Sequence, residues 1–273
     1  MTSTMPPVTT YDTPLPVDFV PPLQNPAPGG LYPNVFWTEV GTDEPSRHLT
    51  GVHVRPAGNF GGDQATGIWE SAWCSVPDLD GERKTGDRPD GLDPFEPVVV
   101  WSYDACDLTE PSRAEVEQRA AQLLRMRESV MVAREFAGRL LADAADLGPV
   151  PTVDDPVAAL AALEGELAEA NVVGYLHLSP EWLPVLTSAQ LIARAGTNWT
   201  TPGGHRLILD GGYVEGLGQT IVATSAPLFG WRDAPQLRTT LDERANLYIA
   251  IAERSVTVGY EAVVAAVEIV PAP

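Results

Sequence analysis

Lysine is almost absent from this chain. Lys84 is the only one. The chain has 17 lysines and arginines but 37 aspartates and glutamates, so the formal net charge is -20. A surface this acidic repels nucleic-acid phosphates, which argues against sequence-specific DNA or RNA binding. The lone ammonium group of Lys84 invites a functional explanation. GC-rich coding, which favours arginine and alanine, is the alternative explanation.

Cysteines and long apolar runs are scarce as well. Cys74 and Cys106 have neither the spacing of a metal site nor that of a disulfide framework. We expect both to be buried or half-buried in neighbouring strands, with a bridge between them as the less favoured alternative. No apolar run is long enough to cross a bilayer, and the first residues lack the features of a signal peptide. These absences favour synthesis and use in a reducing cytoplasm, without membrane contact.

Catalytic and cofactor-binding motifs are also missing. The chain has no Walker loop and no dinucleotide fingerprint, and no metal-ligand spacing relates its four histidines, His48, His53, His177 and His205. A hydrolase triad could be drawn from His177, Ser179 and Asp210. No Gly-x-Ser-x-Gly elbow surrounds Ser179, which is better explained as a helix cap. We therefore expect no metal and no cofactor, and a soluble hydrolase is kept as an alternative function.

Two extended segments are predicted in the first part of the chain. Residues 1–45 are rich in proline, threonine and valine without a period, which indicates an arm that orders against a partner subunit, or else a disordered tail. Strands are predicted over 67–76 and 97–103. The residues between them have turn chemistry, so we expect an outward-reaching β-hairpin with Lys84 at its tip.

An α+β fold is predicted from the remaining residues. A capping box at Ser112 to Glu115 opens a helix whose apolar period continues to Leu141, giving about 30 residues and about 45 Å. A second helix is expected over 155–170, with Pro156 at its first position. Strands are expected, among others, over 172–178, 220–225, 247–258 and 262–270.

Lys84, Asn246 and Glu253 supply the three groups that a side-chain isopeptide bond requires. The lysine amine attacks the carboxamide, the carboxylate transfers protons and ammonia leaves. Desolvation by apolar neighbours would lower the pKa of the lysine. Asn246 and Glu253 are seven residues apart and would face opposite sides of a regular strand. The chemistry therefore needs a bulge, or a base from another subunit.

The order of these elements resembles the Hong Kong 97 fold of the major capsid proteins of tailed phages. The segments "GYLHLSPEWLPVL" (174–186) and "GQTIVATS" (218–225) resemble strands and a helix of its axial domain. Asn246, Glu253 and Arg254 resemble the C-terminal pattern of its crosslinking members, whose lysine lies on the extended loop as Lys84 does here. The resemblance covers most of the chain from about residue 45 onward.

This resemblance implies a Hong Kong 97-like α+β fold in five segments. They are an N-terminal arm (1–45), an extended hairpin loop with the first peripheral strands (46–108), a spine helix (109–150), an axial domain (151–235) and a return to the peripheral domain (236–273). Crosslinking would join Lys84 to Asn246 with Glu253 as the catalytic base.

The resemblance further implies a structural protein, whose only chemistry would be autocatalytic crosslinking. It would be the major capsid protein of a tailed double-stranded DNA phage, assembled in the host bacterial cytoplasm into the virion. Its partners would be copies of itself in the hexamers and pentamers of an icosahedral shell, and portal, scaffold or decoration proteins. The shell would enclose DNA without reading its sequence. An encapsulin-type bacterial nanocompartment, which shares the fold, is the alternative.

Overall fold

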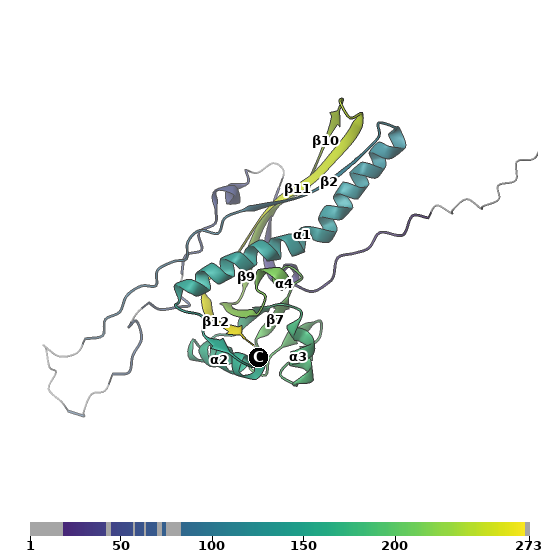
Figure 1. The fold of residues 1–273 in the computed structure, drawn as a ribbon. Helices are drawn as coiled ribbons and strands as arrows, with labels where there is room; N and C mark the ends of the chain where they lie inside the picture. The colour runs from purple at the N-terminus through teal and green to yellow at the C-terminus, as the bar shows by residue number, and fades with distance from the viewer. Residues whose placement is uncertain are drawn as a thin grey trace, which may run out of the picture.

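The molecule is elongated, and one long helix connects its two sheets (Figure 1). The computed structural model describes residues 19–41, 45–56, 58–62, 64–69, 73–74 and 83–270. In Figure 1 an extended N-terminal segment leaves the side of the body near α4, and a long loop leaves the end that lies away from the tip of β10 and β11. Within the described residues, no helix combines the length and apolarity that a membrane crossing needs.

Helix α1 (Glu110–Asp146) contains 37 residues and confirms the predicted long helix. At 1.5 Å per residue it is about 55 Å long. Its buried apolar side chains recur every three or four positions and include Val116, Ala120, Leu124, Val132, Phe136 and Leu140. The predicted capping box at Ser112 is wrong, because the cap position lies three residues earlier, at Thr109, and the helix begins at Glu110. Just before the helix, the Asp107 side chain accepts hydrogen bonds from the amide and the hydroxyl of Thr109. These bonds form a turn that leads into the helix.

The first sheet lies along α1 and has five strands. They are β1 (Val35–Val40), β2 (Val98–Cys106), β9 (Leu228–Asp233), β10 (Gln236–Asp242) and β11 (Leu247–Gly259). Their order is β1-β9-β11-β10, and β2 pairs with the other edge of β11. Ala250 and Ala252 are buried against the helix side, and the Ser102 hydroxyl donates to the Ala120 carbonyl of α1 at 2.6 Å. Small side chains at these positions let the helix approach the sheet closely.

The second sheet has seven strands and forms the compact lower part of the molecule in Figure 1. Its order is β3-β12-β8-β4-β7-β6-β5. The bounds are β3 (Thr152–Val153), β4 (Gly174–Leu178), β5 (Ala193–Ala195), β6 (Asn198–Thr200), β7 (Arg206–Leu209), β8 (Thr220–Ser225) and β12 (Val263–Ile269).

Three helices accompany this second sheet: α2 (Pro156–Glu169), α3 (Trp182–Ser188) and α4 (Tyr213–Gly216). The predicted start of α2 is confirmed, because Asp155 accepts hydrogen bonds from the amides of Val157 and Ala158 and Pro156 opens the helix. A core separate from that of the first sheet lies between α2 and the strands, including Leu160, Leu163, Leu167, Leu176 and Ile221.

The chain crosses between the two sheets more than once. Strand β9, within the segment expected to be axial, pairs with β1 and β11 of the first sheet. Strand β12, within the segment expected to return to the periphery, pairs with β8 of the second sheet. Strand β1 lies inside the expected arm and pairs parallel with β9.

The extended loop is not a regular β-hairpin in its described parts. Residues 67–69 of the predicted strand 67–76 are not in a strand, and the remainder lies outside the described residues except for the turn at 73–74. The only bridge in the described loop joins Val52 and Phe95. Glycine, proline and aspartate dominate here and supply few β-favouring side chains. Even so, the two limbs of the loop pack closely at Gly62. A side chain there would collide with the other limb, because a Cβ on Gly62 would lie 2.6 Å from the carbonyl carbon of Arg88.

Both cysteines are exposed and free, so their predicted burial in neighbouring strands is wrong. Cys74 lies in a turn at φ +59°, and Cys106 is the last residue of β2. The apolar tryptophans beside Cys74 suggested a strand, but the local backbone turns there instead.

Candidate functional site

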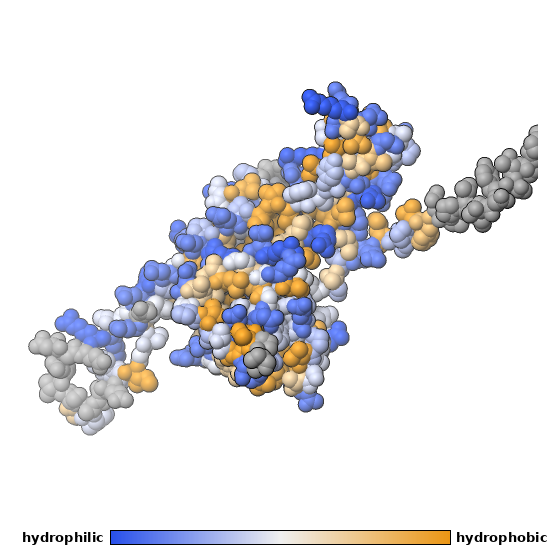
Figure 2. All heavy atoms as spheres, viewed as in Figure 1, coloured by the Kyte–Doolittle hydropathy of each residue, from blue (hydrophilic) through white to orange (hydrophobic). Residues whose placement is uncertain are grey.

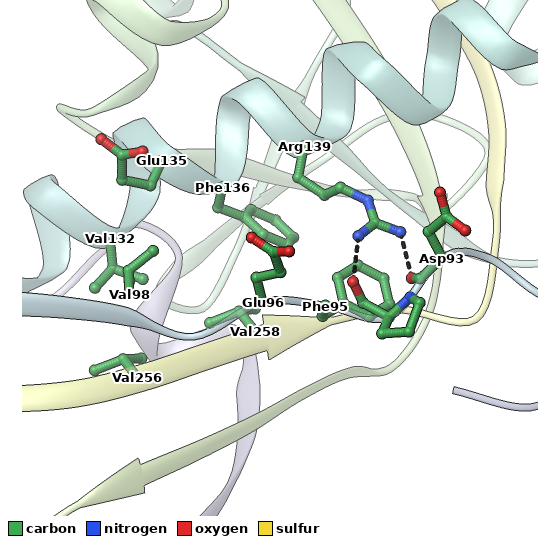
Figure 3. Close-up of a pocket in the computed structure, with 11 residues that line it drawn as sticks. Asp93, Phe95, Glu96, Val98, Val132, Glu135, Phe136, Arg139, Val256 and Val258 are labelled. Carbon is green, nitrogen blue, oxygen red and sulfur yellow. Dashed lines mark hydrogen bonds between the residues drawn. The ribbon is translucent and has the colours of Figure 1, made fainter. Parts of the chain in front are cut away.

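The base of the extended loop is fixed to α1 by Arg139. Its guanidinium donates to the carbonyls of Asp93 at 2.7 Å and Pro94 at 3.0 Å, and lies 4.2 Å from the ring centroid of Phe95 (Figure 3). It also pairs with the buried carboxylate of Asp143 at 2.7 Å. These contacts hold the base of the loop on α1, and the rest of the loop extends away from the body.

A second polar cluster connects α1 to the middle of the first sheet. Arg254 on β11 pairs with Glu128 on α1 at 3.0 Å, and both side chains are about nine-tenths buried. The Tyr32 hydroxyl donates to the same carboxylate at 2.8 Å. Burial, together with the charge of Glu128, raises the pKa of Tyr32 well above its ordinary value. Arg254 therefore joins helix to sheet in this subunit.

Strand β2 carries large exposed apolar side chains on the face of the first sheet that is turned away from α1. Val99, Trp101 and Tyr103 alternate along β2 and expose 57%, 59% and 47% of their surface. Alternate residues share one face of a strand, and the intervening Val100 and Ser102 are turned towards α1. Apolar residues are also visible in patches over the part of the molecule that contains the first sheet and α1 (Figure 2). Large exposed aromatic side chains of this kind mark contact surfaces.

Lys84 lies on the extended loop and is exposed. Its ammonium nitrogen is 5.1 Å from the ring centroid of Trp69 on the other limb of the loop, a cation–π geometry. Lys84 is therefore presented away from the body of the subunit.

Asn246 occupies the turn between β10 and β11, where it is exposed and has φ +55°. Asparagine tolerates this left-handed conformation better than most residues. Figure 1 shows the turn and the extended loop pointing towards opposite ends of the molecule. One subunit therefore does not bring Lys84 and Asn246 together.

Glu253 lies in the middle of β11 and pairs with Arg238 of β10 at 3.0 Å. The pairing of β10 with β11 is regular from Leu247 to Glu253, so no bulge brings Glu253 back towards Asn246. At about 3.3 Å per residue, seven residues separate the two by about 23 Å. A base acting on Asn246 would have to come from another subunit.

The hydrolase triad is not assembled. His177 is fully buried, and its ring nitrogens contact the hydroxyls of Tyr213 and Thr224, each at 2.9 Å. Burial lowers the pKa of His177 to about 3, so the ring is neutral at physiological pH.

The other two members of the triad also have partners of their own. The Ser179 hydroxyl contacts the amide and the carboxylate of Glu181, each at 3.3 Å. Asp210 accepts hydrogen bonds from the amides of Leu31 at 2.8 Å and Gly212 at 3.1 Å. The structure therefore contradicts the His177–Ser179–Asp210 site.

The remaining buried histidines serve the fold. His48 Nε2 lies 3.1 Å from the Ser255 hydroxyl, and His205 Nδ1 accepts the Gly174 amide at 3.2 Å. In the described ranges, no group of three His, Cys, Asp or Glu side chains is arranged to hold a metal ion.

Sequence reasoning missed the two anchors on α1. Glu128 lies four residues after Leu124, and Asp143 lies three residues after Leu140, so both carboxylates fall on the buried stripe of the helix. The sequence could have indicated both carboxylates, because each is a charged residue at a position where the helical period places apolar residues. A charge buried there requires a partner. The partners, Arg254 and Arg139, could then have been sought among the arginines.

The fold matches solved phage structures. One chain of the mature capsid of bacteriophage PhiM1 aligns at a TM-score of 0.53 and 13% identity, over 97% of this chain and 93% of that one. A chain of Microbacterium phage Oxtober96 aligns at 0.51 and 10% identity, over 96% of each chain. A virus-like particle from Pyrococcus furiosus aligns at 0.45, which is too low to carry an argument.

No protein-family model and no curated protein matches the sequence. Identities this low establish the fold alone. The chain has an α+β fold that matches phage capsid structures of the Hong Kong 97 type, with α1 as its long helix.

Proposed function

We propose that this chain is the major capsid protein of a tailed double-stranded DNA phage, built as hexamers and pentamers into an icosahedral shell. The observation that carries the proposal is the fold match to the PhiM1 mature capsid over nearly the whole of both chains.

The surface of the subunit supports the same function. The extended loop and the segment at 19–23 leave the body, and large apolar side chains are exposed on both, including Phe19, Val20, Leu23, Ile68 and Trp73. Trp101 and Tyr103 are exposed on the outer sheet face. Such side chains gain free energy when a neighbouring subunit covers them.

Electron microscopy of the recombinant protein tests the proposal. Closed icosahedral particles are expected, and a uniform small species under all assembly conditions would contradict it. The contents of particles from the native source then separate the two shell functions. Nuclease-protected double-stranded DNA supports the phage capsid, whereas a protein cargo without DNA supports the encapsulin alternative.

We also propose that mature particles carry a bond between Lys84 of one subunit and Asn246 of a neighbour. Both side chains are exposed, and the loop and the turn that carry them point towards opposite ends of the molecule, which suits a bond between subunits. The lysine nitrogen attacks the Asn246 carboxamide carbon, the C–N bond to the amide nitrogen breaks, and ammonia leaves. Glu253 of another subunit takes the proton from the lysine and passes it to the leaving nitrogen.

The chain offers a clean variant for testing this bond. Lys84→Arg keeps a cation over Trp69 but removes the only lysine ammonium. Boiled and reduced wild-type particles should run as ladders on a denaturing gel, and Lys84→Arg particles should run as monomer. A ladder that persists in Lys84→Arg, or wild-type particles that run only as monomer, would overturn the crosslink and leave the shell proposal standing.

A further inference from the structure

The outer edge of β10 is an open strand edge. β10 is the last strand in its sheet order, so one side of its backbone pairs with β11 and, among the described residues, no strand lies along the other. Six of its seven residues are exposed. Its unpaired backbone amides and carbonyls can therefore pair with a further strand.

This edge lacks the features that usually prevent strand addition. Pro235 lies just before β10, and the strand itself contains neither proline nor a register shift. Its one basic residue, Arg238, is directed along the sheet surface to Glu253. Soluble proteins commonly protect a free edge with prolines, bulges or lysines.

The sequence of β10 complements itself when two copies run antiparallel. With two copies of Thr239 opposite each other, Leu237 lies opposite Leu241 of the second copy, and Arg238 lies opposite Thr240. Leu237 and Leu241 share one face of the strand and are 44% and 52% exposed, so the pairing covers apolar surface on both copies. On the other face, Arg238 lies diagonal to Asp242 of the second copy, which places unlike charges near each other.

We propose that β10 pairs with β10 of a second copy about a two-fold axis at Thr239, so that two five-stranded sheets become continuous across a subunit boundary. The inference rests on the proposed shell function, because icosahedral shells contain two-fold contacts and a two-fold contact uses the same patch twice. One seven-residue strand pair is a small interface. The contact therefore forms in the shell, where other contacts hold the subunits in place.

A disulfide at the axis tests the register. In a Cys74→Ser, Cys106→Ser background, Thr239→Cys places two thiols opposite each other, with Cα atoms about 4.5 to 5.5 Å apart, within disulfide range. Oxidised particles should give a dimer on a non-reducing gel. Leu241→Cys in the same background is the matched control, because two copies of position 241 would lie more than about 10 Å apart. Particles of Thr239→Cys without the dimer, or an equal dimer from Leu241→Cys, would overturn the contact.

Charge substitutions test the pairing without a disulfide. Leu237→Glu with Leu241→Glu places like charges opposite each other at both ends of the strand pair. Leu237→Glu with Leu241→Lys places unlike charges there. Particles should be lost in the first variant and retained in the second, while circular dichroism shows the same folded subunit for both. Equal assembly, or equal failure, of the two variants overturns the contact. Failure of the wild-type chain to assemble would instead reject the proposed shell function.

Discussion

At the scale of single residues, buried charges hold the loop and the first sheet on α1. Arg139 reaches from α1 to the loop carbonyls and to Asp143, whose other oxygen accepts the Tyr260 hydroxyl at 2.7 Å. Because Asp143 is buried, removal of its arginine leaves a charge without a countercharge.

Arg139→Ala is therefore expected to lower the free energy of unfolding by about 3 kcal/mol, from the loss of a buried ion pair. Chemical denaturation of the subunit measures this. Arg119→Ala is the matched control, because Arg119 is on the same helix but its pair with Asp104 is exposed on the arginine side. The control should change the free energy by less than about 1 kcal/mol. Equal effects of the two variants would reject the anchoring role of Arg139.

His177 gives stability a definite pH dependence. Its pKa is about 3 in the folded protein, against an ordinary value of 6.5, because burial disfavours the charged ring. Between pH 6.5 and pH 3 the unfolded chain binds a proton at this ring that the folded chain does not bind. Stability from this group is therefore complete above pH 6.5 and falls as the pH is lowered, by up to about 1.4 kcal/mol per pH unit.

Denaturation of wild type and His177→Gln at pH 7, 6, 5 and 4 checks this dependence. Glutamine can hydrogen bond to Tyr213 and Thr224 but does not titrate, so the variant should show a shallower loss of stability below pH 6.5. His53→Gln, at an exposed histidine, should keep the wild-type slope. Parallel curves for wild type and His177→Gln would contradict the prediction.

At the scale of elements, the contact between α4 and α1 depends on a missing side chain. A Cβ on Gly212 would lie 2.5 Å from the Arg134 amide nitrogen and 2.9 Å from the Ala133 carbonyl carbon. Gly138, on the exposed side of α1, has nothing within 4 Å of the same position.

Gly212→Ala should therefore destabilise the subunit by about 1 to 3 kcal/mol through overpacking. Gly138→Ala should stabilise it by about 0.5 to 1 kcal/mol, because alanine favours the helix. Thermal unfolding of the two variants gives the signs directly. A stabilising Gly212→Ala would show that α4 does not pack tightly on α1.

Sequence periodicity predicted the long helix and four of the strands in the second half of the chain. Strands β4, β8, β11 and β12 lie where apolar and β-branched runs predicted them. The cap of α1 was misplaced by three residues because a turn at Asp107 and Thr109 competed with the apparent capping box.

Features that depend on distant partners could not be read from local sequence. Strand β1 was missed because its partner β9 lies about 190 residues later. The crosslinking residues were named from a pattern, and the structure separates them within one subunit, so that hypothesis now depends on contacts between subunits.

At the scale of the whole molecule, the subunit exposes surfaces that a shell would cover. Trp101→Ser should leave the unfolding transition of the free subunit within about 0.5 kcal/mol of wild type, because the side chain is largely exposed. The same variant should assemble poorly, since a large aromatic at an interface contributes strongly to binding. Unimpaired assembly would show that the outer face of β2 is not a subunit contact.

The mass of the purified protein in solution tests the central claim most directly. Sedimentation velocity under assembly conditions should show capsomers and megadalton particles built from the 29.2 kDa chain. A single boundary at the mass of the monomer, at every protein concentration and salt concentration tried, would contradict the account of this protein as a shell subunit.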